Sequence, residues 1–85
     1  MKPAAAVVQD AETELFDELR KLRSEIAKRE GIPPYIVFPD STLREMCGVK
    51  PTNPAAMLKI KGVGEAKFFK YGAYFIEFFK RHLGQ

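Results

Sequence analysis

The stretch IPPYIVFPDSTLREM, residues 32–46, decides the fold class. Its centre, YIVF at residues 35–38, consists of the β-branched and aromatic residues that favour strands. No other part of the chain offers a partner strand, and a strand without partners is not stable. The three prolines of the stretch also exclude one continuous helix. We therefore expect an extended, buried connector, with Ile36 and either Val37 or Phe38 in the core of an all-α domain.

Upstream of the connector, helical periodicity is clear. Apolar residues recur every three or four positions at Leu15, Leu19, Leu22 and Ile26. Either Asp10 or Thr13 can cap the start of this helix, and Gly31 is expected to end it. Residues 1–11 precede the periodic pattern, so we expect a flexible tail or linker there and one folded domain over residues 12–85.

Downstream, the stretch DSTLREMCGVK restarts a helix. Asp40 or Ser41 is the expected cap, and Thr42 with Glu45 fits a capping box. After the turn KPTNP, a short helix is expected, with Asn53 as its cap and a proline in its first position.

The longest predicted helix covers about residues 65–83. Its inward stripe consists of Phe68, Tyr71, Gly72, Phe75, Phe78, Phe79 and Leu83. Gly72 weakens the middle of this helix, and we expect it to let another helix approach closely. Together these segments predict a compact bundle of four to five short helices.

Composition narrows the function classes. The chain has 85 residues, 46% of them hydrophobic, which suits one small core. Its single cysteine, Cys47, excludes an internal disulfide and the usual zinc spacings. No signal core or membrane span is evident, so we expect an intracellular protein, cytoplasmic or associated with the nucleoid.

The net charge of +3 is unevenly distributed along the chain. Residues 1–49 carry seven Lys or Arg and nine Asp or Glu, whereas residues 50–85 carry seven and two, a net charge of +5. A basic half favours an anionic partner. A merely solubilising surface remains the alternative.

The stretch KIKGVGEAK, residues 59–67, lies in this basic half. Gly62 and Gly64 either permit a tight turn with Val63 in the core, or expose backbone N–H groups that bind a phosphate beside a helix start. Long-range attraction would come from Lys59, Lys61 and Lys67. Glu65 opposes the phosphate interpretation, so both remain open.

The order of motifs resembles the HRDC family, the helicase and ribonuclease D C-terminal domain. The resemblance is carried by LFDELRKLRSEIAKREGIPPYIVFPDSTLREM followed by MLKIKGVGEAKFFKYGAYFIEFFKRH, and it covers about residues 12–83. The PPYIVFPDSTLREM wording is most like the copies in RecQ-type DNA helicases. The resemblance implies a helical bundle with a turn like that of a helix-hairpin-helix.

For function, the resemblance implies an accessory, non-catalytic module of an ATP-dependent 3'-5' DNA helicase of DNA repair, recombination and replication. It would bind single-stranded or branched DNA, or dock onto the helicase core or a partner protein. No cofactor is expected in this domain, because no G-x-x-x-x-G-K-[ST] motif is present; ATP and magnesium are expected in the parent motor. Binding of RNA, as in a ribonuclease D-like enzyme, is a further alternative. We expect a monomer.

The candidate nucleic-acid-binding residues are Tyr35, Lys21, Lys28, Arg29, Lys59, Lys61, Gly62, Gly64 and Lys67. The tyrosine of the P-P-Y motif contacts DNA in some HRDC domains, and an exposed ring suits base stacking; a ring at the edge of the core is the alternative. Phe69 and Ile76, seven residues apart on one flank of the last helix, predict a sticky docking surface. No metal ligands are predicted.

Overall fold

The computed structural model describes the backbone of residues 3–84 and the side chains of residues 13–84. Over this part of the chain the elements are α1 (Pro3–Glu30), α2 (Pro34–Val37), α3 (Asp40–Val49), α4 (Pro54–Leu58), α5 (Glu65–Lys67), the π-turn η1 (Phe68–Gly72) and α6 (Ala73–His82). The last three form one continuous helical run. The described residues include no strand, so the all-α prediction is confirmed.

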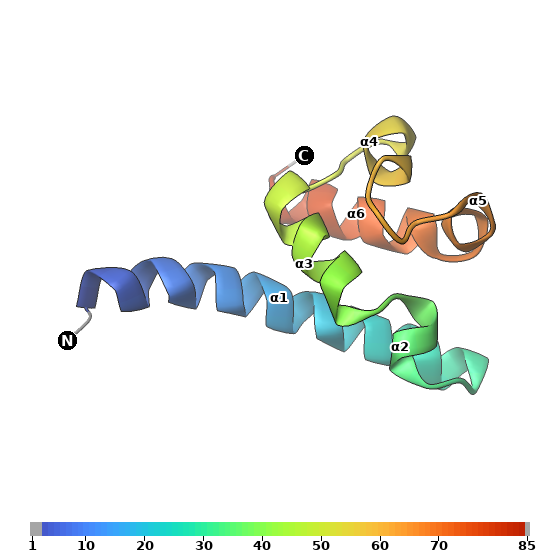
Figure 1. The fold of residues 1–85 in the computed structure, drawn as a ribbon, viewed down its shortest axis with the longest axis horizontal. Helices are drawn as coiled ribbons and strands as arrows, with labels where there is room; N and C mark the ends of the chain where they lie inside the picture. The colour runs from blue at the N-terminus through green and yellow to red at the C-terminus, as the bar shows by residue number, and fades with distance from the viewer. Residues whose placement is uncertain (1–2, 85) are drawn as a thin grey trace.

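The elements are arranged around α3. Figure 1 shows α1 along one side of the molecule and the C-terminal helical run along the other, with α3 between them. α2 lies at the C-terminal end of α1, against which it packs, and α4 packs on η1. One apolar core fills the space between the helices, and its largest fully buried side chains include Phe38, Phe75, Phe79, Leu19 and Leu43.

α1 ends where the sequence predicts and begins earlier. Gly31 follows its last residue with φ of 71°, and the Ile32 N–H donates to the Ala27 carbonyl at 3.0 Å, which closes the helix end. The helix starts at Pro3, so neither Asp10 nor Thr13 is its N-cap. The division into a tail of residues 1–11 and a domain of residues 12–85 stays a prediction.

The connector is helical for one turn, which corrects the extended prediction. Pro33 lies in the N-cap position and Pro34 in the first helical position, where a proline needs no N–H donor. Val37 and Phe38 are both completely buried, whereas Ile36 is 40% exposed, so the prediction for Ile36 is wrong. One helical turn places adjacent residues on different sides, so the turn buries its end and exposes its middle.

A buried arginine holds this connector against α1. Arg23 is only 6% exposed, and its Nη1 donates to the Phe38 carbonyl at 2.9 Å and pairs with Oδ1 of Asp40 at 2.8 Å. Asp40 is the first residue of α3, where a negative charge also suits the helix dipole. The side chain predicted as a cap therefore serves as an ion-pair partner, and α3 has Pro39 at its N-cap with no side-chain hydrogen bond.

The predicted capping box also has a different role. The Thr42 hydroxyl donates to the Lys61 carbonyl at 3.1 Å, and the Lys61 N–H donates to Oε2 of Glu45 at 3.3 Å. Both polar groups of one residue in the glycine turn are thus bonded by α3. Thr42 and Glu45 are available for these long-range hydrogen bonds because the N–H groups at the start of α3 already have local acceptors. For example, the Thr42 N–H donates to the Pro39 carbonyl at 3.1 Å. The cap predicted for α4 is confirmed, since Asn53 Oδ1 accepts from the Ala56 N–H at 2.8 Å.

A π-turn interrupts the last helix, and two expectations for this helix differ from the structure. A π-turn contains an extra residue, so the residues that follow it are rotated by about 100° relative to an unbroken α-helix. Phe69, in the π-turn, is 89% exposed and Ile76, beyond it, is buried, although both line one groove of about 410 Å³. Leu83, predicted inside, is exposed at the end of the run.

Gly72 serves its own helix rather than a neighbouring one. A Cβ at this position would collide with the ring of Phe68, four residues earlier in the same run. The expected close approach of another helix is therefore replaced by the inward folding of a phenylalanine ring over the glycine.

The glycine turn yields a stability prediction with a matched control. Gly62 has φ of 95° and its hydrogen faces the Thr42 hydroxyl, so Gly62→Ala combines backbone strain with a clash. We expect a loss of about 2 kcal/mol or more in the free energy of unfolding, measured by urea denaturation. Gly64 has φ of −84° and open space around it, so Gly64→Ala should cost well under half as much. Equal losses in both variants would contradict this account of the turn.

The Arg23–Asp40 pair predicts how stability depends on pH. The hydrogen bond from Arg23 lowers the pKa of Asp40, more than burial raises it. A lowered pKa in the folded state stabilises the protein above the ordinary aspartate pKa, and this stabilisation is lost as the pH falls below about 4. Asp40→Asn should lower the free energy of unfolding at pH 7 by about 1 kcal/mol, because solvent screens this half-exposed carboxylate. The difference between variant and parent should vanish near about pH 2 in urea titrations; a difference independent of pH would refute the assignment.

Candidate nucleic-acid interface

Tyr35 presents an aromatic ring to solvent. The residue lies in the middle of α2, and its side chain is 64% exposed. Its neighbours Val37 and Phe38 anchor the turn in the core, so the ring stands on a fixed base. This exposure fits the stacking interpretation better than a ring at the edge of the core.

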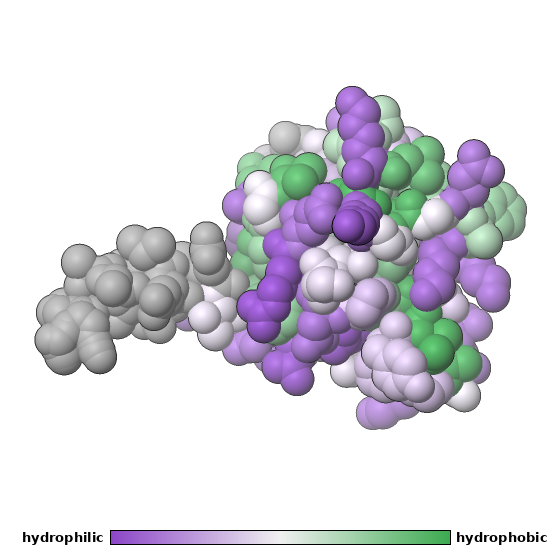
Figure 2. Space-filling view, viewed as in Figure 1, coloured by the Kyte–Doolittle hydropathy of each residue, from purple (hydrophilic) through white to green (hydrophobic). Residues whose placement is uncertain are grey.

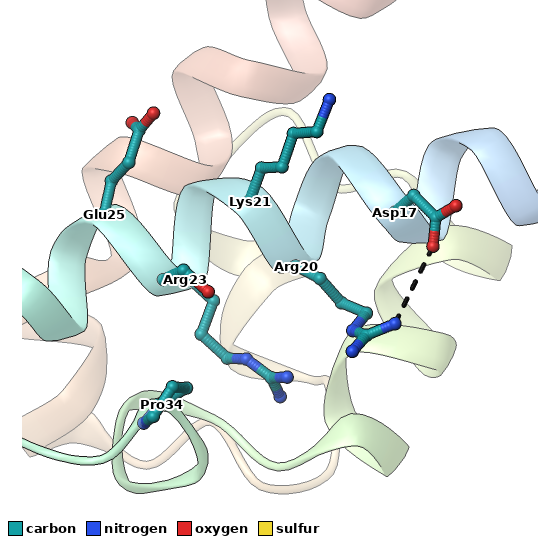
Figure 3. Close-up of a pocket in the computed structure, with 7 residues that line it drawn as sticks. Asp17, Arg20, Lys21, Arg23, Glu25 and Pro34 are labelled. Carbon is teal, nitrogen blue, oxygen red and sulfur yellow. Dashed lines mark ion pairs between the residues drawn. The ribbon is translucent and has the colours of Figure 1, made fainter.

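The basic residues near the end of α1 divide into two groups. Lys21 and Lys28 are exposed, and Lys21 lines a groove of about 610 Å³ together with Pro34, the residue before Tyr35. Figure 3 shows Lys21 pointing away from Pro34, so only its stem borders the groove. Arg29 instead lies against α6, with its Cζ 5.4 Å from the ring centroid of Tyr74 and its Nη1 donating to the Tyr74 hydroxyl at 3.2 Å.

The glycine turn is less free than the sequence suggests. The Lys61 N–H is bonded to Glu45, and the Val63 N–H donates to the Ile60 carbonyl at 3.0 Å. Two donors that a phosphate would use are therefore occupied. Gly64 caps α5 in open space, and the side chains of Lys59 and Lys61 are exposed, so this edge retains positive charge.

Lys67 connects the turn with the connector. Its Nζ lies 6.0 Å from the ring centroid of Phe38, three residues after Tyr35, at a distance where a cation interacts with an aromatic face. Lys67 as a whole is half-buried, so its side chain lies against the domain near α2.

The predicted residues thus fall into three places. Lys67 approaches the connector that carries Tyr35 from α5, and Lys21 borders the groove beside Pro34 with its stem while its ammonium group points away. Lys61 is tied to α3 by its backbone, and Arg29 is directed to α6. Sequence reasoning missed the arginines nearest the groove, Arg20 and Arg23. The sequence signal for them was the run of basic residues in α1 that also contains Lys21.

A model of the HRDC domain family matches residues 12–78 of this chain. The match covers well over half of the sequence. The chain belongs to the HRDC family. This confirms the resemblance found in the motifs.

Relatives of this HRDC domain are parts of DNA helicases. The chain is 50% identical over 74 residues to the ATP-dependent DNA helicase RecQ of Bacillus subtilis, covering 87% of the chain and 12% of that protein. With RecQ of Haemophilus influenzae it shares 44% over 80 residues, covering 94% of the chain and 13% of that protein. With the ATP-dependent DNA helicase UvrD2 of Mycobacterium bovis it shares 38% over 64 residues, covering 75% and 9%.

A solved structure has the same fold. HRDC domain 3 of RecQ from D. radiodurans superposes with a TM-score of 0.81 at 27% identity, covering 87% of this chain and 97% of that one. The chain spans only about an eighth of the length of the RecQ helicases that it matches. In the part of the chain that the structure describes, no helix is long and apolar enough to cross a membrane, and no cluster of three potential metal ligands occurs.

Proposed function

We propose that this HRDC domain is an auxiliary nucleic-acid-binding module of a RecQ-type ATP-dependent DNA helicase. Its ligand is single-stranded or branched DNA, bound by aromatic stacking and phosphate contacts. The observation that carries the proposal is the exposed ring of Tyr35 on a one-turn helix whose next residues are buried. An exposed aromatic on a fixed base, bordered by lysines, has the composition of a single-strand binding site.

The chemistry of such a site is sequence-tolerant. Stacking on Tyr35 contributes about 1–3 kcal/mol per base and works with any base, because every base has a π-face. Lys21, Lys28 and Lys67 add attraction to phosphates and release counterions, which makes the affinity fall with salt. No base-edge readout is involved, so the module increases DNA engagement without selecting a sequence.

The relatives support a DNA substrate and a larger parent. All three relatives described above are ATP-dependent DNA helicases by name. The parent would bind ATP and magnesium in its motor domains and act on DNA in repair, recombination and replication, in the cytoplasm or at the nucleoid. Within it, the HRDC module works as a monomer that holds a strand near the motor.

Binding of labelled oligothymidylate, followed by fluorescence anisotropy at low salt, tests this function. Tyr35→Ala should weaken binding about tenfold or more, because a stacking contact is lost. Tyr35→Phe should retain most of the affinity, because the ring and not the hydroxyl carries the contact. Lys61→Ala and Lys67→Ala should weaken binding less and flatten the salt dependence by about 0.7 per lost phosphate contact.

Lys80→Ala is the matched control, since Lys80 lies on α6 and borders Glu77 at 4.0 Å. This variant should bind oligothymidylate as tightly as the unsubstituted domain does. No binding of oligothymidylate even at low salt would refute the proposal and favour protein docking. Preference for an RNA strand of the same length would favour the ribonuclease D-like alternative.

Protein docking is the second candidate function, and one observation favours it. Phe69 is 89% exposed beside an apolar groove of about 410 Å³, whose other lining residues include Pro54, Phe68 and Ala73. Ile76, the other residue of the predicted docking surface, also lines this groove, but its side chain is buried. The exposed part of the docking surface is therefore Phe69 and the groove beside it. The helicase core of the parent is the partner that this candidate names.

Hydrogen exchange with and without the helicase motor domains tests docking. Added motor domains should protect the amides of residues 69–76 if the groove is occupied, and Phe69→Glu should abolish that protection because it places a charge in the contact. If hydrogen exchange across residues 69–76 of the unsubstituted domain does not change when the motor domains are added, protein docking through this groove is excluded. Tyr35→Ala serves as the control and should leave the protection intact.

A further inference from the structure

Two arginines from different helices share one phenylalanine ring. The Cζ of Arg44, on α3, lies 4.6 Å from the ring centroid of Phe16, and the Cζ of Arg20, on α1, lies 5.7 Å from it. The ring holds both guanidinium groups by cation–π attraction, so two exposed side chains that are normally mobile are kept within about 10 Å of each other.

A third guanidinium, that of Arg23, lies beside this pair. The hydrogen bond from Arg23 lowers the pKa of Asp40, and the charges of Arg23, Arg20 and Arg44 lower it further. The Nε of Arg23 is buried and has no hydrogen-bond partner. Arg23 is thus neutralised by Asp40 but retains an unused donor.

The groove joins this cluster to the connector. Arg20, Arg23 and Pro34 all line it. Figure 3 shows both arginines on the side of α1 that faces Pro34, and Lys21 and Glu25 on the other side. Pro34, the residue next to Tyr35, therefore shares a groove of about 610 Å³ with Arg20 and Arg23. In Figure 2 the visible face mixes hydrophilic and hydrophobic side chains, without one continuous apolar patch.

We infer that this groove, together with the Arg44 side chain held beside Arg20 on Phe16, is a phosphate-binding path for the strand that stacks on Tyr35, with Arg20 and Arg44 as its phosphate ligands. The inference rests on the proposed function and extends it to residues outside the predicted site. Guanidinium groups bind phosphate oxygens in a bidentate manner, and their preorganisation on Phe16 reduces the entropy lost on binding. The strand then runs along α1 from Tyr35 toward α3.

Asp17 competes with the strand for Arg20. Its Oδ1 lies 3.8 Å from Nη1 of Arg20, and both side chains are 54% exposed. This is a weak surface pair that a phosphate can displace. Glu25 also lines the groove but points to the other side of α1 from Arg20 and Arg23, and Asp40 is already engaged by Arg23. Removing the charge of Asp17 should therefore increase the affinity for a strand, an effect that a purely structural role of Arg20 does not produce.

The test is oligothymidylate binding by the whole domain, measured by fluorescence anisotropy over a series of salt concentrations. Arg20→Gln and Arg44→Gln should each weaken binding about fivefold and reduce the salt slope by about 0.7. Asp17→Asn should strengthen binding about twofold to threefold. Arg81→Gln, at an exposed arginine of α6, is the control and should change nothing. Circular dichroism of each variant verifies the fold.

The outcomes separate this inference from the function on which it rests. If Tyr35→Ala weakens binding while Arg20→Gln, Arg44→Gln and Asp17→Asn match the parent, the groove is not the path and the module still binds DNA. If the unsubstituted domain binds no strand at all, this inference and the proposed function both fail. If an acidic peptide binds the unsubstituted domain and oligothymidylate does not, the groove takes a carboxylate ligand and the phosphate assignment is wrong.

Discussion

The bonds of one buried guanidinium fix the geometry on which the rest of this domain depends. Arg23 is almost fully removed from water, and a buried charge is tolerated only when it is paired and hydrogen-bonded. Its two partners, the Phe38 carbonyl and the Asp40 carboxylate, flank Pro39. The arginine therefore binds both sides of the bend between α2 and α3 and holds that bend against α1. Loss of either partner would leave part of the connector free to move.

Fixing the bend determines which aromatic faces the core and which faces water. Phe38 enters the core and meets Tyr71 and Phe75 edge to face, with ring centroids 6.1 Å and 5.3 Å apart. Such pairs add to the stabilisation from apolar burial. Tyr35, three residues earlier on the same short turn, is left outside. The exposed ring is thus positioned by the buried one, and a base that stacks on it meets a surface ordered before binding, which lowers the entropic cost.

The sequence predicted features that depend on local chemistry. The end of α1 at Gly31 and the Asn53 cap of α4 follow from neighbouring residues, and both are present. Features that depend on distant partners were missed. Thr42 and Glu45 fit a capping box in sequence, but they bond Lys61 instead, because folding brings the glycine turn against α3. No pattern within a helix announces such a partner.

The same distinction applies to the charges of the candidate site. Counted along the chain, residues 50–85 are basic and residues 1–49 are slightly acidic, which points to the glycine turn as the anion-binding edge. Folding redistributes that charge, because α3 carries Arg44 to the side of α1 and Phe16 gathers it with Arg20. Packing acts in the same way on apolar residues, since Phe69 and Ile76 line one groove but only Phe69 is exposed. The position of a binding surface therefore depends on helix phase and packing. The net charge of a segment predicts that position only where the segment packs against no other part of the chain.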